Sequence, residues 1–251
     1  MDEDRKADMT AIGFLCPGHR GEDDYPRVEQ LLAGAVRLDL VHTGTGEDAH
    51  AVEPLHGADF AGRLTAAMEG LRLTGAEAVV WTSPAGGFAH GWKGAHAEAT
   101  ELARQAGLPA SSTSLGFVHA ARALGVREVA VAHAYPPKTA ALFRAFLADG
   151  GLEVTGAEEV DALTAERAAE GDEAELLALA RAADTPDAEA VLLPDTALRT
   201  AAHLSALEAA LGKPVLTASQ VSVWEGLRLA DRRLHTDTLG TLFTREPVVQ
   251  L

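Results

Sequence analysis

Two stretches of this chain repeat each other, and the repeat limits the folds that the chain can adopt. AEAVVWTS (76–83) and AEAVLLPD (188–195) align without gaps at an offset of 112 residues. The segments that follow, 107–124 and 212–229, align at an offset of 105 residues. A period of this length is too long for a solenoid, so the chain is interpreted as two copies of one unit. Chance similarity between alanine-rich segments is the alternative.

Apolar runs of strand length alternate with helical patterns through both copies. Several runs are apolar without alternation, which is typical of strands that are covered on both faces. We expect strands at 10–16, 36–42, 76–82, 127–133, 152–156, 188–194 and 213–218, and helices at 57–74, 91–107, 116–124, 137–149, 162–182, 199–211 and 220–229. This alternation predicts an α/β fold with two lobes, each a mainly parallel, doubly wound sheet flanked by helices.

The repeat also predicts where a site would lie. Ligands of open α/β sheets bind in the crevice outside the carboxyl ends of the strands. Ser83 and Asp195 hold equivalent positions in the two copies, each just beyond its strand. If a pseudo-twofold axis relates the lobes, these two side chains face each other across the cleft between them.

Composition and charge exclude several classes of function. The formal net charge is −16 and no cluster of Lys and Arg occurs, so nucleic acid is not an expected partner. No apolar run reaches the roughly 18 residues of a membrane span, and the charged first residues do not form a signal peptide. Cys16 is the single cysteine, so no intramolecular disulfide can form. We expect a cytoplasmic protein without a metal or cofactor, because the histidines lack ligand spacing and no phosphate-binding loop is present.

Four stretches carry a family resemblance: IGFLCPG (12–18), WTSPAGGFAHGW (81–92), GFVHAARALGVREVAVAHAYPP (116–137) and GKPVLTASQVSVWEGLRLA (212–230). They resemble the aspartate/glutamate racemase superfamily, and within it the branch of maleate isomerases and arylmalonate decarboxylases. The resemblance implies two pseudosymmetric lobes with the active site between them. The expected first lobe contains residues 10–113 and 217–251, the second contains 114–216, and residues 1–9 form a disordered tail.

The chain departs from that family at the residues that carry the chemistry. Racemases and maleate isomerases place one cysteine in each lobe, and these cysteines fall on Ser83 and Asp195 here. The Thr-Ser pair that grips a substrate carboxylate in the family becomes Pro84-Ala85. The resemblance thus selects the same two positions as the internal repeat, with different residue types at both.

The resemblance also implies a set of substrate contacts. Tyr135 matches a tyrosine that contacts substrate in the branch. Gly18, His19 and Arg20 follow Pro17 in the first loop, where isomerases present polar groups to a carboxylate. The expected substrate-binding residues are Pro17, His19, Arg20, Pro84, Ala85, Gly86, Tyr135 and Thr196.

These residues favour proton transfer on a small carboxylic acid without a cofactor, as isomerisation or decarboxylation. An aspartate in an apolar cleft can act as general acid or base, and Asp195 is the expected catalytic residue. Ser83 either donates a hydrogen bond to the developing negative charge or attacks the substrate. Arylmalonate decarboxylases work with one acid–base residue, which suits a chain that keeps one such group. Backbone N–H groups around Ala85–Gly87 would have to replace the missing hydroxyl donors.

Other interpretations remain open from the sequence. Ser83 can serve as a hydrolase nucleophile with His133 or His19 as its base, or the chain can bind small acids without turning them over. Local structural roles are a turn or cap for Ser83, an N-cap of helix 199–211 for Asp195, and core packing for Tyr135, His133 and Cys16. Copies of the same chain are the expected protein partners, and no sequence feature fixes their number.

Overall fold

The computed structural model describes residues 9–17, 21–43, 58–83, 87–133, 135–159 and 172–244. It contains two four-stranded parallel sheets with the same strand order. The first sheet has the order β2-β1-β3-β4, from β1 (Thr10–Cys16), β2 (Val36–His42), β3 (Ala78–Trp81) and β4 (Ala110–Ser112). The second has the order β6-β5-β7-β8, from β5 (Glu128–His133), β6 (Glu153–Glu159), β7 (Ala190–Leu193) and β8 (Val215–Thr217). The shared order confirms the predicted two-lobe α/β fold.

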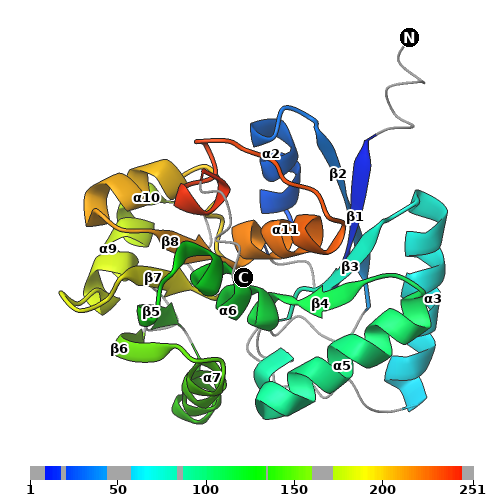
Figure 1. Cartoon of the computed structure of the whole chain (residues 1–251), viewed down its shortest axis with the longest axis horizontal. Coiled ribbons are helices and arrows are strands. Elements are labelled where there is room, and N and C mark those ends of the chain that lie inside the picture. Colours follow the sequence, from blue (N-terminus) through cyan, green and yellow to red (C-terminus); the bar gives the residue numbers. More distant parts are fainter. Residues whose placement is uncertain are drawn as a thin grey trace.

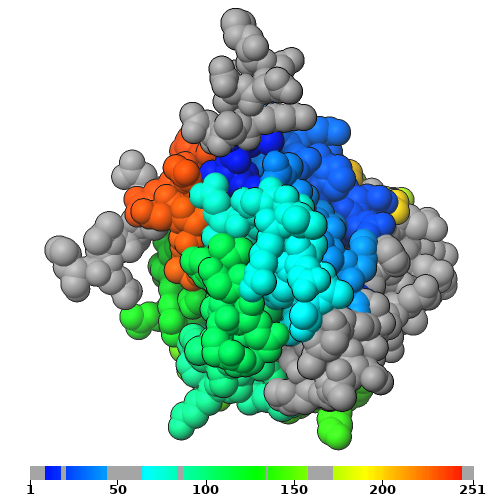
Figure 2. Space-filling view, turned by 90° about the vertical axis from the view of Figure 1, so that its right-hand side faces the viewer, coloured from blue at the N-terminus to red at the C-terminus, as the bar shows by residue number. Residues whose placement is uncertain are grey.

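Helices cover both faces of each sheet (Figure 1). They are α2 (Asp24–Leu31), α3 (Ala58–Thr74), α5 (Gly91–Ala106), α6 (Thr113–Leu124), α7 (Pro137–Asp149), α9 (Glu173–Ala183), α10 (Leu204–Leu211) and α11 (Ala218–Leu229), with a short 3-10 helix at Thr241–Phe243. Helices α3 and α5 flank the first sheet on the outside, and Figure 2 looks onto that flank. Helices α6 and α11 lie in the middle of the molecule, between the two sheets.

Strands β1, β3, β5 and β7 are buried almost throughout because each face packs on a different layer of helices. In β1, Ile12 and Phe14 belong to the central core, whereas Leu15 packs with Leu71 of α3. The second sheet divides in the same way, with one side of each strand facing α9 and α10. Burial on both faces explains why these runs show no polar alternation in the sequence.

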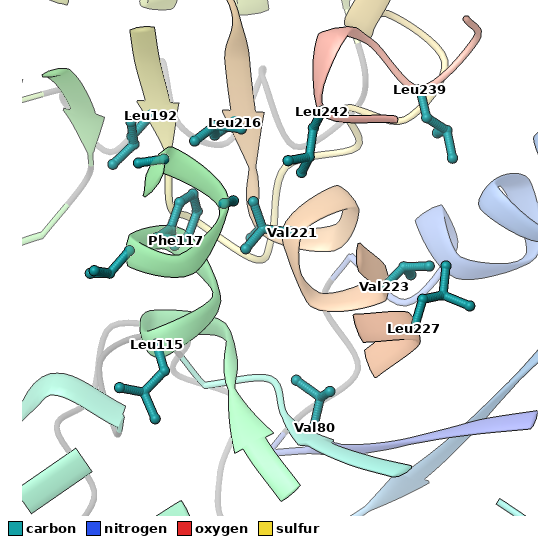
Figure 3. Close-up of a cluster of buried hydrophobic side chains, with 14 of the residues drawn as sticks. Val80, Leu115, Phe117, Leu192, Leu216, Val221, Val223, Leu227, Leu239 and Leu242 are labelled. Atoms are coloured by element: carbon teal, nitrogen blue, oxygen red, sulfur yellow. The ribbon is translucent and has the colours of Figure 1, made fainter. Parts of the chain in front are cut away.

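The central core joins the two lobes through α6 and α11. Figure 3 shows Phe117 of α6 beside Leu192 and Leu216 of the second sheet. On the other side of the helix pair, α11 packs against β1, β3 and β4, and Val80 of β3 belongs to the same cluster. Each central helix therefore shares one continuous apolar core with its partner helix and with both sheets.

Several expected elements differ from the observed ones. The strand β4 and the helix α2 were not expected, and β6 extends to Glu159 rather than ending at 156. The expected helix 199–211 was wrong at its start, because α10 begins at Leu204 and residues 201–203 form a turn before it. The first part of the expected helix 162–182 lies outside the described residues, and α9 begins at Glu173.

Two expectations from the sequence, the amino-terminal tail and the lobe boundaries, are not tested by the described residues. The expected tail falls on residues 1–8 outside the described part and on Met9, which directly precedes β1. The division into lobes at 113/114 and 216/217 stays a prediction, although both boundaries fall where a strand passes into α6 or α11. None of the described helices is long and apolar enough to cross a membrane.

Candidate functional site

The candidate site lies at the carboxyl ends of the parallel strands, where the two repeat copies end in polar residues. Ser83 lies two residues beyond β3, and Asp195 lies two residues beyond β7. Because β3 and β7 hold the same place in their sheets, the two residues are equivalent in the fold as they are in the sequence. Both are buried, with 7% of Ser83 and 5% of Asp195 exposed. Two buried polar residues therefore lie at the carboxyl ends of equivalent strands, where open α/β sheets bind their ligands.

Asp195 begins a turn and stabilises it with its own side chain. Its Oδ1 atom accepts a hydrogen bond of 2.9 Å from the backbone nitrogen of Ala197, and its carbonyl accepts one of 3.4 Å from Leu198. Helix α10 begins later and is preceded by His203. The proposed N-cap role of Asp195 for helix 199–211 is therefore wrong, since the carboxylate caps its own turn instead.

Tyr135, which follows β5, contacts this turn. It is 1% exposed, and its hydroxyl donates a hydrogen bond of 3.3 Å to the carbonyl of Pro194, the residue before Asp195. Burial, followed by the nearby charge of Asp195, raises the pKa of Tyr135 well above its usual value. Tyr135 is thus a hydrogen-bond donor at neutral pH, and it belongs to the core as well as to the surroundings of Asp195.

An aromatic cluster connects the chain beyond Ser83 to Tyr135. The Phe88 ring lies 5.6 Å from the Tyr135 ring and 4.9 Å from the Phe143 ring, measured between centroids. The His133 ring stacks on Tyr135 from another side, at 5.5 Å and an interplanar angle of 15°. The segments that follow β3 and β5 therefore meet in one buried cluster, which brings the two lobes together beside Asp195.

The backbone after Ser83 turns onto the amino-terminal end of α6. The Gly87 nitrogen donates a hydrogen bond of 2.9 Å to the Ser83 carbonyl, and a Cβ at Gly87 would collide with Ser114 Oγ. Ser112 caps α6 by accepting a hydrogen bond of 3.3 Å from the Leu115 nitrogen. Sequence reasoning missed Ser112 and Ser114, although the alignment of 107–124 with 212–229 contained the signal, since small hydroxyl residues end a strand in both copies.

The loop after β1 approaches the Asp195 turn from the first lobe. Gly21 adopts a left-handed conformation with φ of 72°, and a Cβ there would collide with the carbonyl oxygen of Thr196. Pro17, at the other end of this loop, is partly exposed. The structure therefore brings the first loop to Thr196. Of the expected site residues, His19, Arg20, Pro84, Ala85 and Gly86 lie outside the described residues.

Cys16 ends β1 at the same edge of the first sheet, but its chemistry is suppressed. Burial raises the pKa of the Cys16 thiol to about 11, against a weaker opposing effect from the Thr82 hydroxyl, which donates to Sγ at 3.4 Å. A thiol with such a pKa is almost entirely protonated at neutral pH and is a poor nucleophile. Cys16 therefore packs in the core.

A cavity of 440 Å³ lies nearby, between α7 and strands β5 and β6. Its lining is mostly apolar and includes His133, Phe143 and Arg144, but neither Ser83 nor Asp195. His133 and Phe143 belong both to the lining of this cavity and to the aromatic cluster beside Asp195. The Asp195 turn, with its buried carboxylate, carries the chemical interpretation.

Known proteins resemble this chain in sequence and in fold. A model of the arylmalonate decarboxylase family matches residues 42–243. The arylmalonate decarboxylase of Bordetella bronchiseptica is 35% identical over 126 residues, which cover 49% of this chain and 52% of that relative. The aligned part thus spans only about half of the relative's length.

Solved structures extend the similarity to nearly the whole chain. A crystal structure of arylmalonate decarboxylase has a TM-score of 0.76 at 26% identity, covering 94% of this chain and 100% of the other. The maleate cis-trans isomerase of Nocardia farcinica bound to TRIS has a TM-score of 0.78 at 18% identity, covering 94% and 98%. At that identity, the similarity to the isomerase is one of fold.

Proposed function

Because the chain belongs to the arylmalonate decarboxylase family, we propose that it is an enzyme that transfers a proton on a small carboxylic acid without a cofactor. The proposed reaction is decarboxylation or isomerisation, and Asp195 is the proposed acid–base residue. The observation that carries this proposal is the buried Asp195 carboxyl group just beyond β7, beside Tyr135, at a position that the internal repeat pairs with Ser83.

Decarboxylation of a malonate-type acid gives each residue a defined role. The bond between the α-carbon and one carboxylate breaks, CO₂ leaves, and the electron pair remains on an enediolate. Asp195 in its acid form gives a proton to the α-carbon, which yields the monoacid, and water then reprotonates Asp195. One proton donor on one side of the α-carbon is sufficient, so the reaction does not need the two thiols that racemisation uses.

Negative charge on the enediolate needs hydrogen-bond donors. We propose the Ser83 hydroxyl as one donor, since it lies at the corresponding edge of the first sheet. The Gly87 nitrogen is engaged with the Ser83 carbonyl, so it does not serve as one of the backbone donors expected around Ala85–Gly87. His19, Arg20 and the amides of Ala85 and Gly86 are the proposed remaining partners of the substrate carboxylates.

Substitution of Asp195 tests the proposed function directly. Asp195→Asn keeps the size of the side chain but removes its proton, so turnover should fall by about 10²–10⁴-fold. Ser83→Ala removes one donor to the developing charge and should cost about 10²-fold. The substrates are arylmalonates and maleate, and products are followed by chromatography. In D₂O, decarboxylation of an arylmalonate should place deuterium on the α-carbon of the product.

The control is Asp187→Asn, an exposed residue in the turn that leads into β7. It should leave turnover unchanged, because it lies at the opposite end of that strand from Asp195. Unchanged turnover in both Asp195→Asn and Ser83→Ala would refute the proposed roles. Thermal stabilisation by an acid of the panel, without any product, would instead identify a binding protein that has lost catalysis.

We also propose that the enzyme works in the cytoplasm and that copies of the chain associate. Both proposals follow from the family resemblance. Cell fractionation measures the first and analytical ultracentrifugation the second, with a single monomeric species at micromolar concentration as the result that contradicts association.

A further inference from the structure

Asp24, in the first turn of α2, is a buried carboxylate that collects hydrogen bonds from a distant part of the chain. Its Oδ2 atom accepts hydrogen bonds from the Thr200 nitrogen at 2.8 Å, the Thr200 hydroxyl at 3.2 Å and Ser219 Oγ at 2.7 Å. The Ala201 nitrogen donates to both carboxylate oxygens, at 3.2 and 3.3 Å. Only 4% of Asp24 is exposed, so these donors replace the water that a carboxylate normally binds.

Two of the three donor residues belong to the segment that carries Asp195. Thr200 and Ala201 lie five and six residues after Asp195, before α10 begins, and Ser219 lies in the first turn of α11. Near the beginning of that segment, the Thr196 carbonyl packs against Gly21. The segment from Asp195 to Ala201 is therefore held by the first lobe at both ends, through the residues that follow β1.

We propose that Asp24 is a positioning residue for Asp195. It holds the segment 195–201 against α2 and thereby fixes the direction of the Asp195 carboxyl group. This inference rests on the proposed function, in which Asp195 transfers the proton. Asp24 acts through the backbone of the segment and does not touch the substrate. Precise placement matters because a displacement of about 1 Å in a reacting group can lower a rate about 100-fold.

A buried acid at this position costs free energy, which favours a specific role for it. Burial raises the pKa of Asp24 above its usual value, even though hydrogen bonds from Ser219, Thr200 and Ala201 oppose that rise. The charged form is therefore less favourable here than in water. An exposed acid in the first turn would interact equally with the α2 dipole and would not be buried. The dipole alone therefore does not explain why this acid is buried.

The neighbouring Asp23 supplies a matched control. It is 67% exposed and forms an ion pair of 2.7 Å with Arg199, so it contacts the same segment from the surface. Exposed ion pairs contribute little to stability. Removal of a buried carboxylate, by contrast, leaves the backbone N–H groups that donated to it without an acceptor. Comparison of variants at the two adjacent aspartates thus distinguishes the effect of the buried hydrogen bonds from the effect of negative charge at the start of α2.

Hydrogen–deuterium exchange tests the contact without any substrate. In Asp24→Ala, amides within 195–201 should exchange at least about tenfold faster, because Thr200 and Ala201 lose their acceptor. In Asp23→Ala the same peptides should exchange as in the wild type. Asp24→Asn retains an acceptor oxygen and should keep exchange within about threefold of the wild type. If Asp24→Ala does not fold, Ser219→Ala removes the shortest donor and should show a smaller increase in the same peptides.

Kinetics then connect the segment to the reaction. Asp24→Ala should lower kcat about 100-fold with KM changed less than about threefold, because the proton donor is misplaced while substrate contacts persist. Asp24→Asn should recover most of that loss, and Asp23→Ala should match the wild type.

Two results overturn the inference. Equal exchange of 195–201 in Asp24→Ala and the wild type shows that the carboxylate does not hold the segment. Faster exchange with unchanged kcat shows that the segment does not position Asp195. A wild-type enzyme that turns over no acid of the panel refutes the proposed function instead, while the exchange experiment still decides whether Asp24 holds the segment.

Discussion

Cys16 shows that a position beside the candidate site does not by itself make a residue reactive. Cys16 lies at the sheet edge that carries the candidate site, yet burial raises the pKa of its thiol to about 11. At pH 8 roughly one molecule in a thousand holds the thiolate, so Ellman's reagent should react at least about 100-fold more slowly with the folded protein than with the unfolded chain. The absorbance change belongs to Cys16 alone because the sequence has no other cysteine.

The Cys16→Ala variant, which should give no absorbance change, provides the blank. A rapid, stoichiometric reaction of the native protein would contradict the suppressed reactivity and would make Cys16 a candidate nucleophile. Core packing was predicted for this residue because it ends the first strand at a position where the resembled family usually has an apolar residue. Asp24, by contrast, was not found from the sequence, since its partners lie 176 to 195 residues away and no local pattern points to them.

At the scale of elements, the approach between the first loop and the Asp195 turn depends on a glycine. Gly21 and Gly34 have nearly the same left-handed φ, 72° and 67°, but only Gly21 has a neighbour where a Cβ would stand. Alanine at either position costs about 1–2 kcal/mol for the backbone conformation. Gly21→Ala should lose about 1–3 kcal/mol more, because the Thr196 carbonyl must move. Urea unfolding of both variants measures the difference, and equal losses would contradict the close approach.

The elements that the sequence predicted and those that it missed differ in how they are stabilised. β1 and β2 agree with expectation at both ends, because each is a seven-residue run of mostly apolar or β-branched residues. β4 has three residues, ASS, and its place depends on pairing with β3 rather than on its own composition. The start of α10 was misplaced because Asp24 binds the backbone of Thr200 and Ala201, a tertiary contact that overrides local helix propensity.

For the whole molecule, the pair of central helices carries a buried ionic cluster between the lobes. Glu225 of α11 is fully buried, and it accepts hydrogen bonds from Arg228 at 2.8 Å and contacts His119 Nδ1 of α6 at 2.9 Å. Burial alone would raise the pKa of Glu225, but the hydrogen bonds and charges of Arg228 and His119 outweigh it and lower the pKa to about 2. The helices share the central core of both sheets, so this carboxylate affects global unfolding.

The depressed pKa fixes the direction of the pH dependence. Glu225 titrates near 4.5 in the unfolded chain, so its stabilising contribution is complete above that pH and is lost as the pH falls toward 2. Between pH 6 and pH 3 the free energy of unfolding should decrease by about 2 kcal/mol from this group. Glu225→Gln, which cannot titrate, should unfold more easily at pH 6 and lose about 2 kcal/mol less than the wild type on acidification. Parallel pH profiles of the two proteins in urea would show that another carboxylate controls the acid stability of the molecule.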